Sequence, residues 1–243
     1  MSNKLLVIGQ VIPEPQSSAA GTRILQLIAL FQEQGFEIVF ATAAQDGEHP
    51  FSLAAINVRV ERIVLNHSSF DEMVRVMAPD IVLFDRYMTE EQYGWRIAEN
   101  CPDALRVLDS EDLHCLRNER QKSIKHSLPF VKENLLQNEI AKREIASIYR
   151  CDLTLIISKV EMEMLQNVFQ LSESSLFYLP LLLDKPITKR PPFEERRHFV
   201  SIGNFLHPPN WDAVLTLKNE IWTKIRVEIP KAEIHIYGAY TSQ

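Results

Sequence analysis

The sequence predicts an α/β protein with a doubly wound parallel sheet, followed by the start of a second domain of the same kind. Three observations lead to this prediction. Short apolar runs, typical of buried parallel strands, alternate with longer segments whose apolar residues recur at helical spacing. The apolar runs end in turn residues. A proline-rich stretch then separates most of the chain from residues 198–243, which repeat the strand–helix–strand pattern.

The first domain is expected to span residues 1–180. The run KLLVIG predicts its first strand, and the next helix has Ile24, Leu27, Ile28 and Phe31 on one face and ends at Gly35. One parallel sheet is expected to contain strands near 4–9, 36–42, 81–85, 105–109 and 153–157, with further strands at 58–65 and 176–179. Helices are expected at 70–77, 90–99, 111–150 (interrupted near Pro129) and 160–169.

Residues 181–197 are predicted to be a linker. Prolines are frequent there, and proline neither continues a helix nor pairs well in a central strand. The charge also changes: residues 1–180 hold 17 basic and 25 acidic residues, and residues 181–243 hold 9 and 7. Residues 198–243 are predicted to form a strand at 199–202, a helix at about 210–227 and a strand at 234–237.

Composition excludes several classes of function. The net charge is 26 − 32 = −6 with no block of Lys or Arg, so nucleic acid is not an expected partner. No apolar run reaches the roughly 18 residues of a membrane span. The N-terminus lacks a signal-peptide cleavage site, which predicts a cytoplasmic protein. Cys101, Cys115 and Cys151 form neither a disulfide framework nor a zinc motif. Cys115 adjoins His114, but a buried bystander thiol is favoured over a nucleophile.

Ligands of such sheets bind beyond the carboxyl ends of the strands, so the loops there are the candidate sites. After the first strand, Gly21, Thr22 and Arg23 are interpreted as an anion site at a helix start; the alternative is a plain loop with a surface arginine. After the strand at 81–85, Asp85 and Arg86 either contact a polar ligand or pair with each other.

The densest polar cluster, DSEDLHCLR, follows the strand at 105–109 and contains Asp112 and His114. Neighbouring carboxylates can orient an imidazole and stabilise its charge. The alternative is an acidic helix start with Ser110 as its cap and His114 at the surface. Beyond the linker, a predicted strand ends at Gly203 and Asn204, which form either a phosphate loop or only a turn.

Four segments, in this order along the chain, resemble the retaining group-1 (family-4-like) glycosyltransferases of the GT-B fold. They are PEPQSSAAGTRILQL, FDRYMTEEQYGWRIAENCPDALRVLDSEDLHCLR, YRCDLTLIISKVEMEML and FVSIGNFLHPPNWDAV. The resemblance covers nearly the whole chain and implies two Rossmann-like domains facing a cleft. It also implies transfer of a sugar from a nucleotide-diphosphate donor to a hydroxyl acceptor. It places His114, with Asp112, at the sugar site, and the glycine loops at Gly21 and Gly203 near the donor phosphates.

The sequence departs from this family after residue 198, because the family's second domain is larger and carries a glutamate pair that has no counterpart here. The chain alone is therefore expected to be catalytically silent, with a partner chain or self-association through the incomplete second domain. No metal or other cofactor is implied, since no DxD-like pair ends a strand; Asp109 and Glu111 come nearest. Two alternatives remain: an enzyme like the UDP-sugar 2-epimerases, which share the fold, and a non-catalytic binding subunit.

Overall fold

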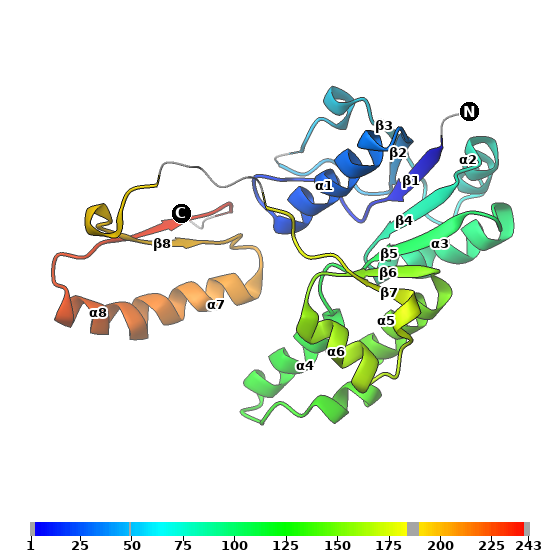
Figure 1. Ribbon diagram of the computed structural model, residues 1–243. Helices are drawn as coiled ribbons and strands as arrows, with labels where there is room; N and C mark the ends of the chain where they lie inside the picture. Colours follow the sequence, from blue (N-terminus) through cyan, green and yellow to red (C-terminus); the bar gives the residue numbers. More distant parts are fainter. Residues whose placement is uncertain (1–2, 49, 184–189, 241–243) are drawn as a thin grey trace. The chain divides into compact units, whose positions relative to one another are not determined.

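A computed structural model describes residues 3–48, 50–183 and 190–240. The chain divides into two units (Figure 1). The first comprises the described residues of Met1–Pro13 and Arg23–Leu182, and the second those of Glu14–Thr22 and Leu183–Gln243. No helix in the described ranges is both long and apolar enough to cross a membrane.

The first unit is built on a seven-stranded, entirely parallel sheet with the order β3-β2-β1-β4-β5-β6-β7. Its strands are β1 (Lys4–Ile8), β2 (Glu37–Thr42), β3 (Arg59–Arg62), β4 (Ile81–Asp85), β5 (Leu105–Asp109), β6 (Leu153–Ile156) and β7 (Leu176–Tyr178). The order reverses direction between β1 and β4, and in doubly wound sheets such a switch point marks the ligand-binding edge.

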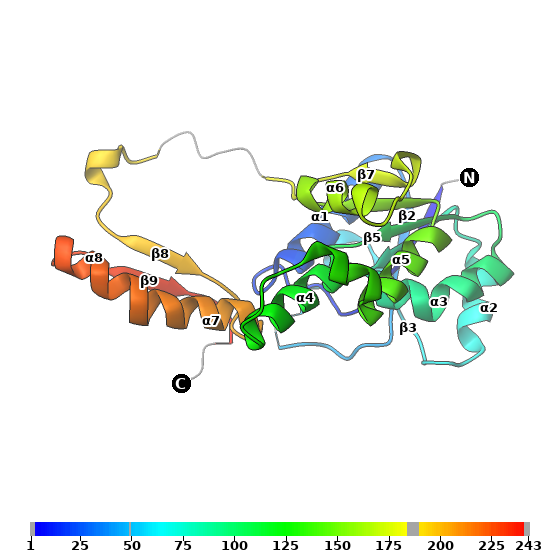
Figure 2. The ribbon, with the colours of Figure 1, turned by 90° about the horizontal axis from the view of Figure 1, so that it is seen from below.

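Helices cover both faces of this sheet (Figures 1 and 2). They are α1 (Ala19–Glu33), α2 (Ser69–Met77), α3 (Tyr87–Asn100), α4 (His114–Lys125), α5 (Glu139–Arg150) and α6 (Lys159–Asn167). Helix α1 packs with Ile24, Leu27 and Ile28 on one face of the sheet, while α2 to α6 share the core of the other. Burial on both faces explains why the central strands read as continuous apolar runs.

The second unit contains two parallel strands, β8 (Phe199–Ile202) and β9 (Ile234–Tyr237). A helical segment connects them: α7 (Pro208–Thr216), a π-helical turn at Leu217–Ile221, and α8 (Trp222–Glu228). Phe199 packs edge-to-face on Trp222 of α8 at 5.7 Å between ring centroids. The side chains of β8 and β9 that alternate with Phe199 therefore point away from this helix.

The predicted fold class is confirmed: all five strands expected in one sheet lie there in parallel, with β3 and β7 at its edges. The long helical region predicted at 111–150 is divided into α4, a 3₁₀ segment at Lys132–Gln137 and α5. The predicted helix at 210–227 begins earlier, at Pro208, and contains the π-helical turn. Of the predicted linker 181–197, residues 184–189 lie outside the described residues.

Candidate functional site at the carboxyl ends of β4 and β5

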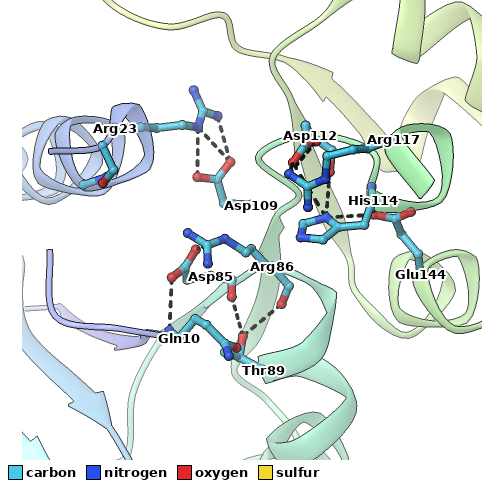
Figure 3. A network of polar contacts seen from close by, with 12 residues as sticks. Gln10, Arg23, Asp85, Arg86, Thr89, Asp109, Asp112, His114, Arg117 and Glu144 are labelled. Atoms are coloured by element: carbon cyan, nitrogen blue, oxygen red, sulfur yellow. Dashed lines mark hydrogen bonds and ion pairs between the residues drawn. The ribbon is translucent and has the colours of Figure 1, made fainter. Parts of the chain in front are cut away.

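The carboxyl ends of β4 and β5 bring charged side chains together (Figure 3). Asp85 and Asp109 are the last residues of these strands and are direct partners in the parallel register. Both are buried, at 5% and 0% exposure. A buried carboxylate is costly unless it is paired or hydrogen-bonded, so the surroundings of each determine what this edge can do.

Asp109 is paired with Arg23 of α1. Arg23 Nε lies 2.9 Å from both carboxylate oxygens and Nη2 lies 2.8 Å from Oδ1, while Nη1 donates to the Leu179 carbonyl at 3.0 Å. The arginine side chain is only 2% exposed. Burial raises the pKa of Asp109, and the guanidinium opposes this rise. The structure thus differs from the predicted anion site, because the Arg23 cation is buried and already engaged by a carboxylate.

The hydrogen bonding of Gly21 and Thr22 also differs from what an anion site would require. Helix α1 begins at Ala19, two residues earlier than expected. Gly21 N–H donates to Ser18 Oγ at 3.0 Å and Thr22 N–H to the Ser18 carbonyl at 3.2 Å, so these donors are not free for an anion. A Cβ on Gly21 would lie 2.6 Å from the Glu14 carbonyl carbon. The glycine is therefore explained by close backbone packing.

Asp85 and Arg86 pair with each other, the second of the two alternatives. Arg86 Nε lies 3.5 Å from Asp85 Oδ1, and Asp85 Oδ2 accepts from the Gln10 N–H at 3.0 Å. Arg86 has φ 71° and ψ 158°, a region that residues with a side chain rarely adopt. Its N–H donates to the Asp109 carbonyl at 2.9 Å, which holds this backbone against β5. The Arg86 side chain is 20% exposed and can still reach a ligand.

Glu111 is the residue of the cluster whose side chain lacks a hydrogen-bond partner at one oxygen within the described part of the chain. It is 8% exposed, and its Oε1 has no hydrogen-bond partner among the described residues. Burial, reinforced by the charges of Asp109 and Asp85, raises the pKa of Glu111 to about 8. Its backbone has φ 60°, in the left-handed region. The side chain is therefore a neutral acid at neutral pH, able both to donate and to accept a hydrogen bond.

His114 is the first residue of α4 and is mostly buried, with 13% of its side chain exposed. Its Nδ1 lies 3.0 Å from the Asp112 carbonyl oxygen and 3.8 Å from Asp112 Oδ1. A carbonyl only accepts, so Nδ1 carries the hydrogen, and in the neutral ring Nε2 is then the acceptor. The ring packs edge-to-face on Tyr87 at 5.4 Å. The structure thus places Asp112 beside His114, and the Asp112 carboxylate also binds Arg117 at 3.1 Å.

Glu144 of α5 is a site residue that the sequence did not reveal. It is 1% exposed, and its two oxygens accept from the N–H groups of His114 and Cys115, each at 3.0 Å. A carboxylate there satisfies donors at the positive end of α4. Ser110, the predicted cap, instead donates to the Leu155 carbonyl at 2.9 Å. Glu144 lies 30 residues from His114 in sequence, so no local pattern could indicate it.

The remaining predicted residues, Gly203 and Asn204, follow β8 in the second unit. Gly203 N–H donates to the Tyr237 carbonyl at 3.1 Å. Asn204 Oδ1 accepts from the Leu206 N–H at 3.0 Å, and its carbonyl accepts from Asn210 Nδ2 at 3.0 Å. These bonds fix the backbone of the loop, as either the turn or the phosphate-loop interpretation requires.

No protein-family model and no curated protein matches this sequence. Solved structures of other proteins share its architecture. The sucrose-phosphate synthase of Thermosynechococcus elongatus superposes with a TM-score of 0.67 at 12% identity, over 99% of this chain and 63% of that one. A putative UDP-N-acetylglucosamine 2-epimerase from Listeria monocytogenes superposes with a TM-score of 0.52 at 13% identity, over 100% of this chain and 64% of that one. The lipopolysaccharide outer core galactosyltransferase WaaB superposes with a TM-score of 0.50 at 14% identity, over 82% of this chain and 52% of that one.

These likenesses establish the fold class: the chain has the GT-B fold, which two glycosyltransferases and an epimerase share with it. It is thus a GT-B-fold protein that spans about half to two thirds of the length of these structures. At such low identity the function has to be argued from the site itself.

Proposed function

We propose that this chain contributes to glycosyl transfer, in which a sugar moves from a nucleotide-diphosphate donor to a hydroxyl acceptor. Its first unit would bind the acceptor at the carboxyl ends of β4 and β5. Support comes from the GT-B fold and from a polar cluster at the sheet edge where doubly wound folds bind ligands.

The observation that carries this proposal is Glu111. A sugar hydroxyl both donates and accepts hydrogen bonds, and a neutral carboxyl with an unpartnered buried oxygen complements it. The charges around it are balanced, because Asp109 is paired with Arg23 and Asp85 with Arg86. A neutral polyol therefore fits this edge better than a diphosphate, because the Arg23 and Arg86 cations are already paired with carboxylates.

His114, Asp112, Asp85 and Arg86 complete the proposed acceptor side. With Nδ1–H directed to the Asp112 carbonyl, His114 presents Nε2 as an acceptor for a sugar hydroxyl. Glu144 positions the histidine through its backbone N–H. Stabilisation of the transition state would come from such fixed groups, which need no rearrangement during reaction. The donor phosphates are proposed to bind at Gly203 and Asn204, since the geometry at Gly21, Thr22 and Arg23 argues against those residues.

The test is ligand binding by variants at two histidines. We expect His114→Ala to weaken binding of a sugar acceptor, or of the sugar part of a UDP-sugar, by about tenfold, the loss of one buried hydrogen bond. Affinity for UDP alone should stay unchanged. His126→Ala, at the exposed end of α4, is the matched control. Calorimetry gives the affinities and urea unfolding gives the stabilities. Equal losses of folding and binding in His114→Ala would support a structural role instead.

The products formed distinguish this proposal from its alternative. The 2-epimerase in the comparison has the same fold, so the fold does not separate the two activities. Incubation of the chain with UDP-N-acetylglucosamine, with and without a hydroxyl acceptor, separates them by mass spectrometry and NMR. A glycosylated acceptor supports transfer. The C2 epimer, formed without an acceptor, would overturn it, and binding without turnover would agree with a chain that is catalytically silent on its own.

A further inference from the structure

We infer that the second unit carries a binding site for a transition-metal dication, formed by His198, Glu233 and His235. Their ligand atoms all lie within 4.8 Å of one another. Two imidazoles and a carboxylate are a donor set that suits zinc and similar ions. The three residues take no part in the proposed acceptor site, which belongs to the first unit.

The topology of β8 and β9 brings these residues together. The register pairs Val200 with His235, and Phe199 N–H donates to the Glu233 carbonyl at 2.9 Å. Side chains alternate along a strand, so His198, Glu233 and His235 project from the same sheet face. This is the face opposite to Phe199, which packs on α8. His235 lies on β9, and His198 and Glu233 directly precede β8 and β9, so the pairing of the two strands brings together ligands that are 35 residues apart in sequence.

The spacing of the ligand atoms favours a bound ion over direct hydrogen bonds. Glu233 Oε2 lies 3.5 Å from His235 Nε2 and 3.7 Å from His198 Nδ1. Hydrogen bonds of this kind measure about 2.7–3.2 Å. Two ligand atoms on a tetrahedral ion with bonds of roughly 2.0–2.1 Å lie about 3.3–3.4 Å apart. The two distances from Glu233 Oε2 are therefore close to those that a shared ion would impose, and the three ligand atoms together lie within 4.8 Å.

A second observation is the state of His235 Nε2. This atom is buried and has no hydrogen-bond partner within the residues that the structure describes. A buried polar atom without a partner is unfavourable, and a metal ion would satisfy it. The side chains of His198, Glu233 and His235 are 46%, 64% and 42% exposed, so a hydrated ion has access to them. Three protein ligands would leave one tetrahedral position for water.

The experiment is calorimetric titration of the tag-free chain with Zn²⁺, together with Co²⁺ absorption spectroscopy, which reports tetrahedral coordination. We expect one site per chain. We also expect about tenfold or greater weakening in His235→Ala and in Glu233→Gln, since each removes a ligand. His207→Ala, a histidine of the same unit outside the cluster, should bind like the parent. Circular dichroism verifies that each variant is folded.

Three outcomes would overturn the inference: no Zn²⁺ binding by the parent chain, equal binding by the parent and a His198→Ala/His235→Ala variant, or a Co²⁺ spectrum of octahedral type only. Should His235→Ala fail to fold, His198→Ala provides the same comparison, because His198 lies outside β8 and is exposed.

Discussion

Arg23 and Asp109 form a bidentate ion pair that is completely shielded from solvent and joins α1 to the end of β5 across 86 residues of sequence. Such a pair contributes little net stability compared with apolar residues of the same volume. Its loss on one side, however, leaves a buried charge without a partner. This asymmetry makes the pair a sensitive probe of how the sheet edge is assembled.

Asp109→Asn should destabilise the protein by about 3–5 kcal/mol, because it strands the Arg23 cation in a buried position. Urea unfolding of both forms measures this difference. The control is Asp46→Asn, whose partner Arg62 and own side chain are both largely exposed; it should change stability by about 0.5 kcal/mol or less. Similar effects of the two substitutions would show that the Arg23–Asp109 pair is not buried in solution.

Glu111 should make stability depend on pH. Its pKa is about 8 in the folded chain, against an ordinary value of 4.5 for a glutamate, so between these limits the unfolded chain releases a proton that the folded chain keeps. This contribution is complete below about pH 4.5. It is then lost as pH rises, by up to about 1.4 kcal/mol per pH unit.

Glu111→Gln removes this dependence, so the parent should lose stability relative to the variant between about pH 5 and pH 8. Urea unfolding at several pH values measures the two curves. Parallel curves would mean that Glu111 is ionised in the native state, and the hydrogen-bond argument for a sugar hydroxyl would then fail.

Glu144→Ala should destabilise the chain by about 1–3 kcal/mol, because two buried N–H groups at the start of α4 lose their acceptor. Glu139→Ala, on the same helix α5, is the control, since Glu139 is 82% exposed and pairs only with exposed Lys142. Thermal and urea unfolding compare them. The idea that Glu144 caps α4 is contradicted if both variants unfold alike.

Cys115 and Cys151 should be unreactive in the native protein. Both are buried, and burial raises the pKa of each thiol; at Cys115 the Glu144 carboxylate adds to this effect. Reactive cysteines need the opposite environment, exposed and electropositive. Labelling with a thiol reagent at about pH 8, followed by mass spectrometry, should modify these residues only after urea is added. Rapid labelling of native Cys115 would restore the nucleophile hypothesis.

The fold was largely predictable because its signals are local. The runs that became β1, β4 and β5 are buried on both faces and therefore uniformly apolar. Turn and helix-start residues after these runs defined the predicted ends of the strands, and this placed Asp85 and Asp109 at strand ends. The approximate location of the candidate site followed directly, because parallel strands deliver their last residues to one edge.

The partners within the site were not predictable, because they depend on tertiary packing. Arg23 was expected to be open to anions, and nothing in its neighbourhood indicates that Asp109 would reach it. The left-handed backbone of Glu111 and the unusual one of Arg86 have no glycine to indicate them. Likewise, the proximity of His198 to His235 follows only once β8 and β9 are known to pair in register.

The strand order also has a consequence for synthesis on the ribosome. Strand β1 emerges first but lies in the interior of the sheet, between β2 and β4. Arg23 emerges 86 residues before the carboxylate that pairs with it. In a nascent chain that ends before β5, strand β4 has one edge without a partner strand, and Arg23 has no carboxylate to pair with. Both features favour premature association with other chains. Completion of β5 pairs the free edge of β4 and supplies the carboxylate for Arg23, and β5 is then the open edge until β6 is added.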